Sequence, residues 1–246
     1  MNLRYIAIGL DYETYIMHEN KLRYEVQLHT RFISNYFSKE IRKLKFTTDG
    51  SYNMISVSLM FNELQCSKLV PSDVLKVYVP FDKKRYEIIK GTGDCSYYLE
   101  LLEEGFHKAA EFKNIPLNSL INIINQFKAG GFKNEWVHKK KKLKEIDLEV
   151  SLFCEFTTNY FQLIITIIRA SSKEELVKGA LIKTEPYEVL FEKMFKDIVV
   201  DKENITITDA SNSPRMIISL EDVFKKKFNY QILGDEGIKR ILTLRV

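Results

Sequence analysis

The chain has 246 residues, of which 45% are hydrophobic and 12% aromatic, and its formal net charge is +4. This composition excludes an intrinsically disordered chain, because such chains are poor in aromatic residues and rich in charge of one sign. A charge so near balance does not by itself indicate binding to nucleic acid or to a membrane surface.

No segment has the character of an export signal or a membrane span. The apolar run in the opening MNLRYIAIGL is too short for a signal peptide, and no later segment approaches the roughly 18 uncharged apolar residues of a transmembrane helix. Cys66, Cys95 and Cys154 form an odd set with no CxxC pair and no histidine at zinc-ligand spacing. We therefore predict a cytoplasmic protein with no disulfide framework, metal, cofactor or membrane attachment.

Residues 1–90 alternate between strand and helix patterns. Residues 3–10 form a candidate strand, and apolar residues then recur every three or four positions from about 20 to 45, which predicts a long amphipathic helix. Further strands are expected at 54–61, 73–80 and 84–90, the last two joined by a turn around Phe81. This pattern predicts a small antiparallel sheet crossed by one helix.

Two helices are predicted next, at 94–111 and 116–129. Asp94 is the expected N-cap of the first, and Pro116 suits the first turn of the second, which a glycine pair ends. Because only a few residues connect them, we expect an antiparallel pair.

Strand patterns dominate the rest of the chain. Residues 146–156 alternate between apolar and polar, and residues 161–169 are apolar on both faces, so the two segments predict a central hairpin. The remaining expected elements are a strand at 175–183, a helix at 184–199 capped by Thr184, a hairpin of 204–209 with 215–220, a short helix from Ser219 and a final strand at 241–246.

These elements predict a mixed α+β fold with antiparallel sheets and packed helices. Strand-then-helix patterning restarts after KAGGFKN, near residue 130. The chain is therefore expected to form an N-terminal α+β half at 1–130 and a C-terminal α+β half at 131–246, or else a single large domain that contains both as closely packed subdomains.

Basic charge is concentrated at 131–144, which holds six lysines and one glutamate. The candidate partner-binding residues are Trp136, Lys139, Lys140, Lys141, Lys142 and Lys144. They would offer an anchoring ring and a positive surface to phosphates or to an acidic protein. The alternatives are a solvated helix or a lysine-bearing strand edge with Trp136 in the core, or a lysine segment that faces the acidic helix at 94–111 within the fold.

Two short stretches are candidates for hydrolytic chemistry. Cys95 lies near a helix N-terminus behind GTG, where a thiolate could be stabilised, although no feature selects a base among His18, His29, His107 and His138. The alternative is a half-buried cysteine in a capped turn. His29 lies on the apolar stripe of its helix and is expected to be a hydrogen-bonded core residue.

Asp11 and Glu13, directly after the first strand, form the second candidate. They resemble the first acidic motif of the proofreading-exonuclease superfamily, in which two carboxylates hold metal ions for phosphodiester hydrolysis. The later aspartates of that superfamily do not follow at matching spacing. The alternative role for these carboxylates is to cap the next helix.

The leading hypothesis is a non-enzymatic protein that binds another protein, in the manner of bacterial toxin-neutralising or immunity proteins. It rests on the many aromatic residues, the segregated charge and the lack of a recognisable catalytic motif. An accessory nucleic-acid-binding protein that uses the lysine segment is the first alternative. A hydrolase built on Cys95, or on Asp11 and Glu13, is the second.

Overall fold

The structure is a computed structural model that describes residues 1–61, 65–188, 191 and 193–243. The chain divides into two compact units, Met1–Asn134 and Glu135–Val246, which we call unit 1 and unit 2. Helices and sheets both contribute, so the predicted mixed α+β class is confirmed. Within the described ranges, no helix combines the length and apolar character that a membrane crossing requires.

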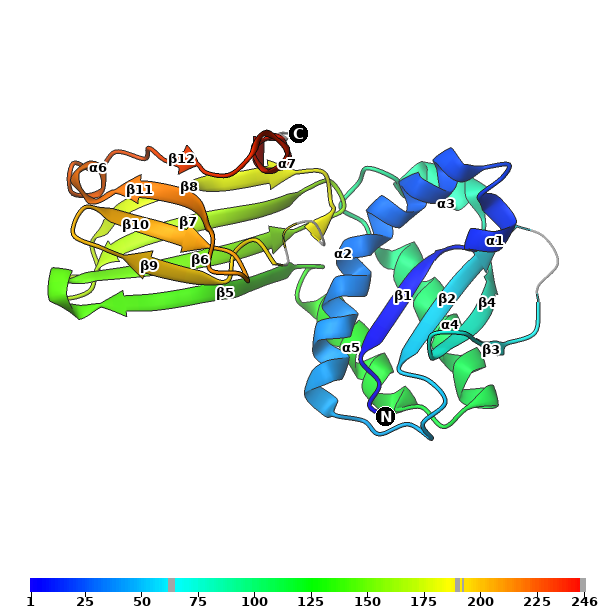
Figure 1. Ribbon diagram of the computed structural model, residues 1–246. Helices are drawn as coiled ribbons and strands as arrows, with labels where there is room; N and C mark the ends of the chain where they lie inside the picture. The colour runs from blue at the N-terminus through cyan, green and yellow to red at the C-terminus, as the bar shows by residue number, and fades with distance from the viewer. Residues whose placement is uncertain (62–64, 189–190, 192, 244–246) are drawn as a thin grey trace. The chain divides into compact units, whose positions relative to one another are not determined.

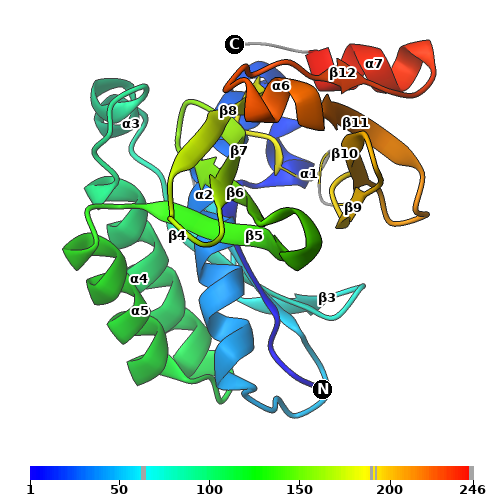
Figure 2. The same cartoon turned by 90° about the vertical axis from the view of Figure 1, so that its left-hand side faces the viewer.

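Unit 1 is a four-stranded sheet with helices on one side. Its elements are β1 (Tyr5–Leu10), α1 (Tyr12–Tyr15), α2 (Asn20–Leu44), β2 (Met54–Met60), β3 (Lys68–Val70), β4 (Val74–Pro80), α3 (Lys83–Ile89), α4 (Ser96–Phe112) and α5 (Leu117–Ala129). The strand order is β1-β2-β4-β3, and Figures 1 and 2 show α4 and α5 together on the same face of the sheet. The long predicted helix is confirmed as α2.

Two predictions for unit 1 were wrong. β1 pairs with β2 and β2 with β4 in parallel, and only β3 is antiparallel to its neighbour. The parallel arrangement is accessible because α2 is long enough to carry the chain back from the end of β1 to the start of β2. The strand expected at 84–90 is helix α3, because the Asp82 carboxylate caps it by accepting hydrogen bonds from the backbone N of Lys84 and Arg85 at 2.8 and 3.2 Å.

Helix α2 also closes the free edge of β1. Three hydroxyl residues one turn apart on α2 meet the strand's unpaired backbone groups. Ser38 Oγ accepts a hydrogen bond from Ile6 N at 3.0 Å, Ser34 Oγ accepts one from Ile8 N at 3.3 Å, and Thr30 Oγ1 donates to Ile8 O at 2.9 Å. The edge of a parallel sheet is thereby protected without a further strand.

Close packing fixes α4 on the sheet. A Cβ added to Gly105 would lie 2.5 Å from Cγ2 of Val57 on β2, well inside ordinary van der Waals contact. Val57 is fully buried. Phe37 of α2 lies between Phe106 of α4 and Phe127 of α5, with ring centroids 6.1 Å from each. These contacts make the helices and the sheet one core, and they set where the first turns of α4 lie.

Unit 2 consists of two stacked sheets with short helices. Its elements are β5 (Asn134–Leu143), a 3-10 turn (Lys144–Ile146), β6 (Leu148–Phe156), β7 (Phe161–Arg169), β8 (Glu175–Thr184), β9 (Asp197–Val200), β10 (Asn204–Thr208), β11 (Pro214–Ser219), α6 (Leu220–Phe224), β12 (Gln231–Ile232) and α7 (Glu236–Thr243). One sheet has the order β5-β6-β7-β8 and the other β12-β11-β10-β9 (Figure 1). The predicted hairpins β6–β7 and β10–β11 are confirmed as antiparallel pairs.

Two elements predicted for unit 2 were wrong. In place of a helix at 184–199, Thr184 ends β8, Glu188 is in 3-10 conformation, and the other described residues form bends, turns, irregular backbone and β9. Phe191 stacks on Phe161 with ring centroids 5.6 Å apart. Burial of this aromatic side chain in the unit's core prevails over the local helical pattern. The final strand expected at 241–246 is instead the end of α7 as far as Thr243, and residues 244–246 lie outside the described part of the chain.

Candidate functional site

The lysine segment forms β5, which is an edge strand. Trp136 is half-buried, and its ring centroid lies 6.3 Å from that of Phe161. Lys139 Nζ lies 3.1 Å from the carboxylate of the first residue of β9, and Lys141 Nζ donates to a backbone carbonyl of the same strand at 2.6 Å. Two of the four consecutive lysines therefore hold the edges of the two sheets together.

The other two lysines of the run converge on one carboxylate. Glu149 of β6 is almost fully buried, and Lys140 Nζ lies 2.7 Å from its Oε1. Lys173 and Lys142 place their ammonium groups 3.6 and 3.8 Å from Oε2. The hydrogen bond from Lys140 and the charges of the three lysines lower the pKa of Glu149. Lys144 follows in the 3-10 turn and is exposed.

The sequence alternative of a lysine-bearing strand edge thus describes the local structure. The carboxylates that Lys139, Lys140 and Lys142 contact belong to unit 2, whereas the acidic helix α4 belongs to unit 1. Binding of a partner by these lysines and Trp136 stays a prediction.

Asp11 caps α1 from the end of β1. Its Oδ1 accepts hydrogen bonds from Thr14 N at 3.0 Å and Thr14 Oγ1 at 2.8 Å, and Lys76 Nζ lies 2.7 Å from Oδ2. Burial alone would raise the pKa of Asp11, but the Lys76 ion pair and the Thr14 hydrogen bonds outweigh it and lower the pKa. Glu13 is exposed, and its carboxylate lies 3.8 Å from the same ammonium.

A lysine of the protein itself therefore stands between the two carboxylates that resemble a metal-binding motif. Among the described residues, no group of three His, Cys, Asp or Glu side chains is placed to hold a metal ion. The arrangement of Asp11 and Glu13 fits the capping alternative.

Cys95 is buried and occupies the N-cap position of α4 in place of the predicted Asp94, whose carboxylate accepts a hydrogen bond from Ser96 N at 2.8 Å. Burial, with a smaller effect of the Asp94 charge, raises the pKa of the Cys95 thiol to about 12. A thiol in this state does not supply the thiolate that a cysteine hydrolase needs.

The histidines have structural partners or face outward. His29 Nδ1 lies 2.9 Å from the hydroxyl of Tyr86, which donates to Glu25 at 2.7 Å, so the predicted hydrogen-bonded core histidine is confirmed. Its burial lowers the pKa of His29. His138 bonds to a backbone carbonyl of unit 2, and His107 is exposed on α4.

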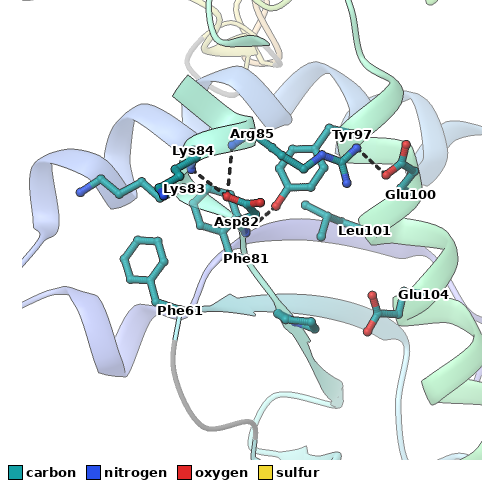
Figure 3. A pocket seen from close by; sticks show the side chains of 11 residues that line it. Phe61, Phe81, Asp82, Lys83, Lys84, Arg85, Tyr97, Glu100, Leu101 and Glu104 are labelled. Carbon is teal, nitrogen blue, oxygen red and sulfur yellow. Dashed lines mark hydrogen bonds and ion pairs between the residues drawn. The ribbon is translucent and has the colours of Figure 1, made fainter. Parts of the chain in front are cut away.

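A concave site lies where β2 and β4 end, a location that sequence analysis did not single out. A pocket of about 730 Å³ opens there between the strand ends, α3 and α4 (Figure 3). Its lining residues are Phe61, Pro80, Phe81, Asp82, Lys83, Lys84, Arg85, Tyr97, Glu100, Leu101 and Glu104. The carboxyl ends of parallel strands are where open sheets with packed helices usually bind ligands, and the volume lies within the roughly 300–1,000 Å³ of known ligand pockets.

The floor of the pocket is aromatic and fixed in place. Phe81 lies between Phe61 and Tyr97, with ring centroids 5.4 and 6.2 Å away, and Leu101 extends the apolar surface. Phe81, Tyr97 and Leu101 are each at most 5% exposed. The Tyr97 hydroxyl accepts a hydrogen bond from Asp82 N at 2.6 Å, so its own proton is left to donate to a ligand.

The rim of the pocket carries both basic and acidic side chains. The Arg85 guanidinium lies over the Tyr97 ring, 4.3 Å from its centroid, and Nη2 donates to Glu100 Oε2 at 2.7 Å (Figure 3). Burial raises the pKa of Tyr97, which keeps the hydroxyl neutral and a donor. Glu104 on the same helix forms an ion pair with Lys108 at 2.8 Å.

This pocket can hold an apolar or aromatic group against its floor, with one hydrogen-bond donor from Tyr97 and a planar cation beside it. Sequence analysis missed it for two reasons. The lining comes from three separate segments of the chain, at residues 61, 80–85 and 97–104, and the segment that supplies Arg85 was predicted to be a strand.

No protein-family model, no curated protein and no solved structure shows significant similarity to this chain. The functional interpretation therefore rests on the geometry of the site.

Proposed function

We propose that the protein acts by binding another protein, and that the pocket at the ends of β2 and β4 receives an anchoring side chain of that partner. The observation that supports this proposal most directly is the pocket's composition. Buried Phe81, Tyr97 and Leu101 form the floor, and the Arg85 guanidinium lies over the Tyr97 ring. Aromatic and arginine side chains dominate the small sets of residues that supply most of the energy of protein interfaces.

The polar groups around the floor favour binding over catalysis. The Asp82 carboxylate is engaged in capping α3, and Arg85 is paired with Glu100. A general acid, base or nucleophile needs a free group with a pKa suited to proton transfer. The Tyr97 hydroxyl, with its raised pKa, serves better as a fixed donor to a partner's carbonyl or carboxylate.

A toxin-neutralising or immunity role is the finer form of this proposal. It requires that the partner be a toxin whose activity falls when the complex forms. The lysine edge, which is strand β5, supports the nucleic-acid alternative less than it supports a structural role, because Lys139, Lys140 and Lys141 make contacts within unit 2.

The test is affinity capture from the native host's lysate, with and without nuclease, using the wild-type chain and two variants. Arg85→Ala removes the guanidinium at the rim of the pocket. The ion pair with Glu100 that is lost with it is exposed, so the fold is expected to remain intact. Arg169→Ala is the matched control, because Arg169 also contacts a glutamate, at 3.8 Å, and lies over a ring, at 5.8 Å, but belongs to unit 2.

We expect one dominant protein, bound stoichiometrically and insensitive to nuclease. Its affinity should fall at least about tenfold for Arg85→Ala, as for an interface residue worth more than about 1.4 kcal/mol, and should be unchanged for Arg169→Ala. Equal capture by all three chains would overturn the role of the pocket. Recovery of nucleic acid alone, lost when Lys139 to Lys142 are changed to alanine, would overturn the protein-binding proposal.

A further inference from the structure

The sheet of unit 1 has a second face that no described helix of that unit covers. In Figures 1 and 2, α4 and α5 lie on one face of the strands and the other face is open. Val57 points to the helical face, where it meets Gly105 of α4. Its strand neighbours Ser56 and Ser58 therefore point to the other face, where Ser56 is half-buried and Ser58 is 4% exposed. Parallel strands are almost always covered on both faces, so an open one indicates a missing layer.

Small side chains form the middle of this open face. The strand register places Ala7 beside Ser56 and Gly9 beside Ser58. Ala7, Gly9 and Ser56 are half-buried, and a Cβ added to Gly9 would meet nothing within 4 Å. Glycine inside a strand often marks a site where another segment approaches closely. Apolar residues extend the surface on one side, with Tyr5 42% exposed and its register partner Met54 half-buried.

A buried hydroxyl on the same face lacks a partner. Tyr78 is paired with Ser58 in the register and so points to the open face. Tyr78 is 2% exposed, and its hydroxyl makes no hydrogen bond within the described part of the chain. The ammonium groups of Lys68 and Lys76 lie 5.7 and 5.6 Å from its ring centroid. If these lysine side chains moved to pair with an incoming carboxylate, the Tyr78 hydroxyl could donate a hydrogen bond to that carboxylate.

The cations around the face indicate the charge of what covers it. Arg4 and Arg42 flank the Tyr5 ring at 5.9 and 5.8 Å, and Lys68 lies beside Lys76 in the register. Of these four cations, Lys76 alone has a carboxylate of a described residue within ion-pair distance. An acidic partner is therefore favoured, and a second copy of this chain would oppose like charges across a two-fold axis.

The size of the face indicates a single helix. Three strands of six or seven residues and the three-residue β3, spaced about 4.8 Å apart, give a surface of roughly 360 Å². This is about half of the roughly 800 Å² that each protein buries in a stable interface. An α-helix about 10 Å wide would fit along the small residues, with its two flanks over the cationic rims.

We propose that this open face binds one amphipathic helix of a partner protein, with small or apolar residues along its contact stripe and Asp or Glu on its flanks. The face is separate from the aromatic pocket. The proposal therefore stands or fails independently of the pocket's role.

The test selects helical peptides from a displayed library of amphipathic sequences, with the full wild-type chain as bait. Enriched peptides are synthesised, and their affinities are measured by fluorescence anisotropy against wild type, Gly9→Val, Lys68→Glu, Arg85→Ala and the control Gly93→Val. Gly9→Val should fold at least as well as wild type, because valine is favoured in strands and the added Cβ has no neighbour within 4 Å. Gly93 is matched to Gly9 in having no neighbour within 4 Å and no left-handed backbone.

We expect the enriched peptides to carry acidic flanks. Their affinity should fall at least tenfold for Gly9→Val and Lys68→Glu and remain unchanged for Gly93→Val and Arg85→Ala, with circular dichroism confirming each fold. Failure to enrich any peptide, unchanged binding to Gly9→Val or a lack of acidic bias would each overturn the proposal. Peptides that lose affinity only for Arg85→Ala would also overturn it and would place the binding in the pocket.

Discussion

Gly105 of α4 lies so near Val57 of β2 that one added methyl group should disturb the packing of the helix on the sheet. The change is Gly105→Ala, which places a methyl group 2.5 and 2.8 Å from the two Cγ atoms of Val57. Ordinary contact begins at 3.4 Å, so α4 must move away from β2 by close to an ångström. Because α4 carries Tyr97 and Leu101, the same movement would open the floor of the pocket.

Overpacking of this kind lowers the free energy of unfolding by about 1–3 kcal/mol. The better helix propensity of alanine offsets about 1 kcal/mol of that loss. We therefore expect Gly105→Ala to lower the free energy of unfolding of unit 1 by about 1 kcal/mol, equivalent to roughly 3–5 °C in melting temperature. Val57→Ala alone should cost about 2 kcal/mol through the cavity it leaves. In the double variant the new methyl group fills that cavity. The loss of unfolding free energy in the double variant should therefore be smaller than the sum of the two single losses by about 1 kcal/mol or more.

The two units can be followed by different spectroscopic signals. The long helices α2, α4 and α5 lie in unit 1, so far-ultraviolet circular dichroism follows that unit. The chain's one tryptophan, Trp136, lies in unit 2, so its fluorescence follows the other. The circular dichroism transition should shift in Gly105→Ala and partly recover in the double variant. A Gly105→Ala chain as stable as wild type, or strictly additive costs, would refute the close packing of α4 on β2.

Two further predictions concern titratable groups. At pH 8 a thiol reagent should modify Cys66 rapidly, because it is exposed, whereas Cys95 and Cys154 should react only after unfolding, because both are buried; rapid reaction of more than one thiol in the folded chain would contradict this. The pKa of Asp11 is lower in the folded chain than in the unfolded one, so its contribution to stability is present above the unfolded pKa of about 4 and is lost as the pH falls through the folded value. Asp11→Asn should therefore be less stable than wild type at pH 7, and urea denaturation should show the difference in unfolding free energy narrowing as the pH falls below about 4. A difference that does not change with pH would argue against the ion pair with Lys76.

The elements that could be predicted from sequence are those whose signal is local. Helix α2 was predicted almost to its ends, because its apolar stripe runs through Val26, Ile33 and Ile41, all buried. The β6–β7 hairpin was predicted because alternation between apolar and polar residues sets both the strand and its buried face. The parallel pairing of β1, β2 and β4 could not be predicted in this way, since strand direction depends on the connections between strands.

The candidate site shows the same limit more strongly. The lysine run was conspicuous in the sequence, yet its side chains largely pair within unit 2. The pocket was not predicted because Phe61, Phe81 and Tyr97 meet only after the strands align and α3 forms. A short capped helix such as α3 has too few residues for periodicity to separate it from a strand.

Hydrogen exchange of the complex with the captured partner tests the central claim most directly. The free and bound chains are compared amide by amide. If the pocket is the binding site, protection should appear in the first turn of α3, at Lys84 to Tyr86, and in the first turns of α4, at Leu99 to Glu104. Protection confined to β5, with α3 and α4 unchanged, would contradict the account and return the binding site to the lysine edge.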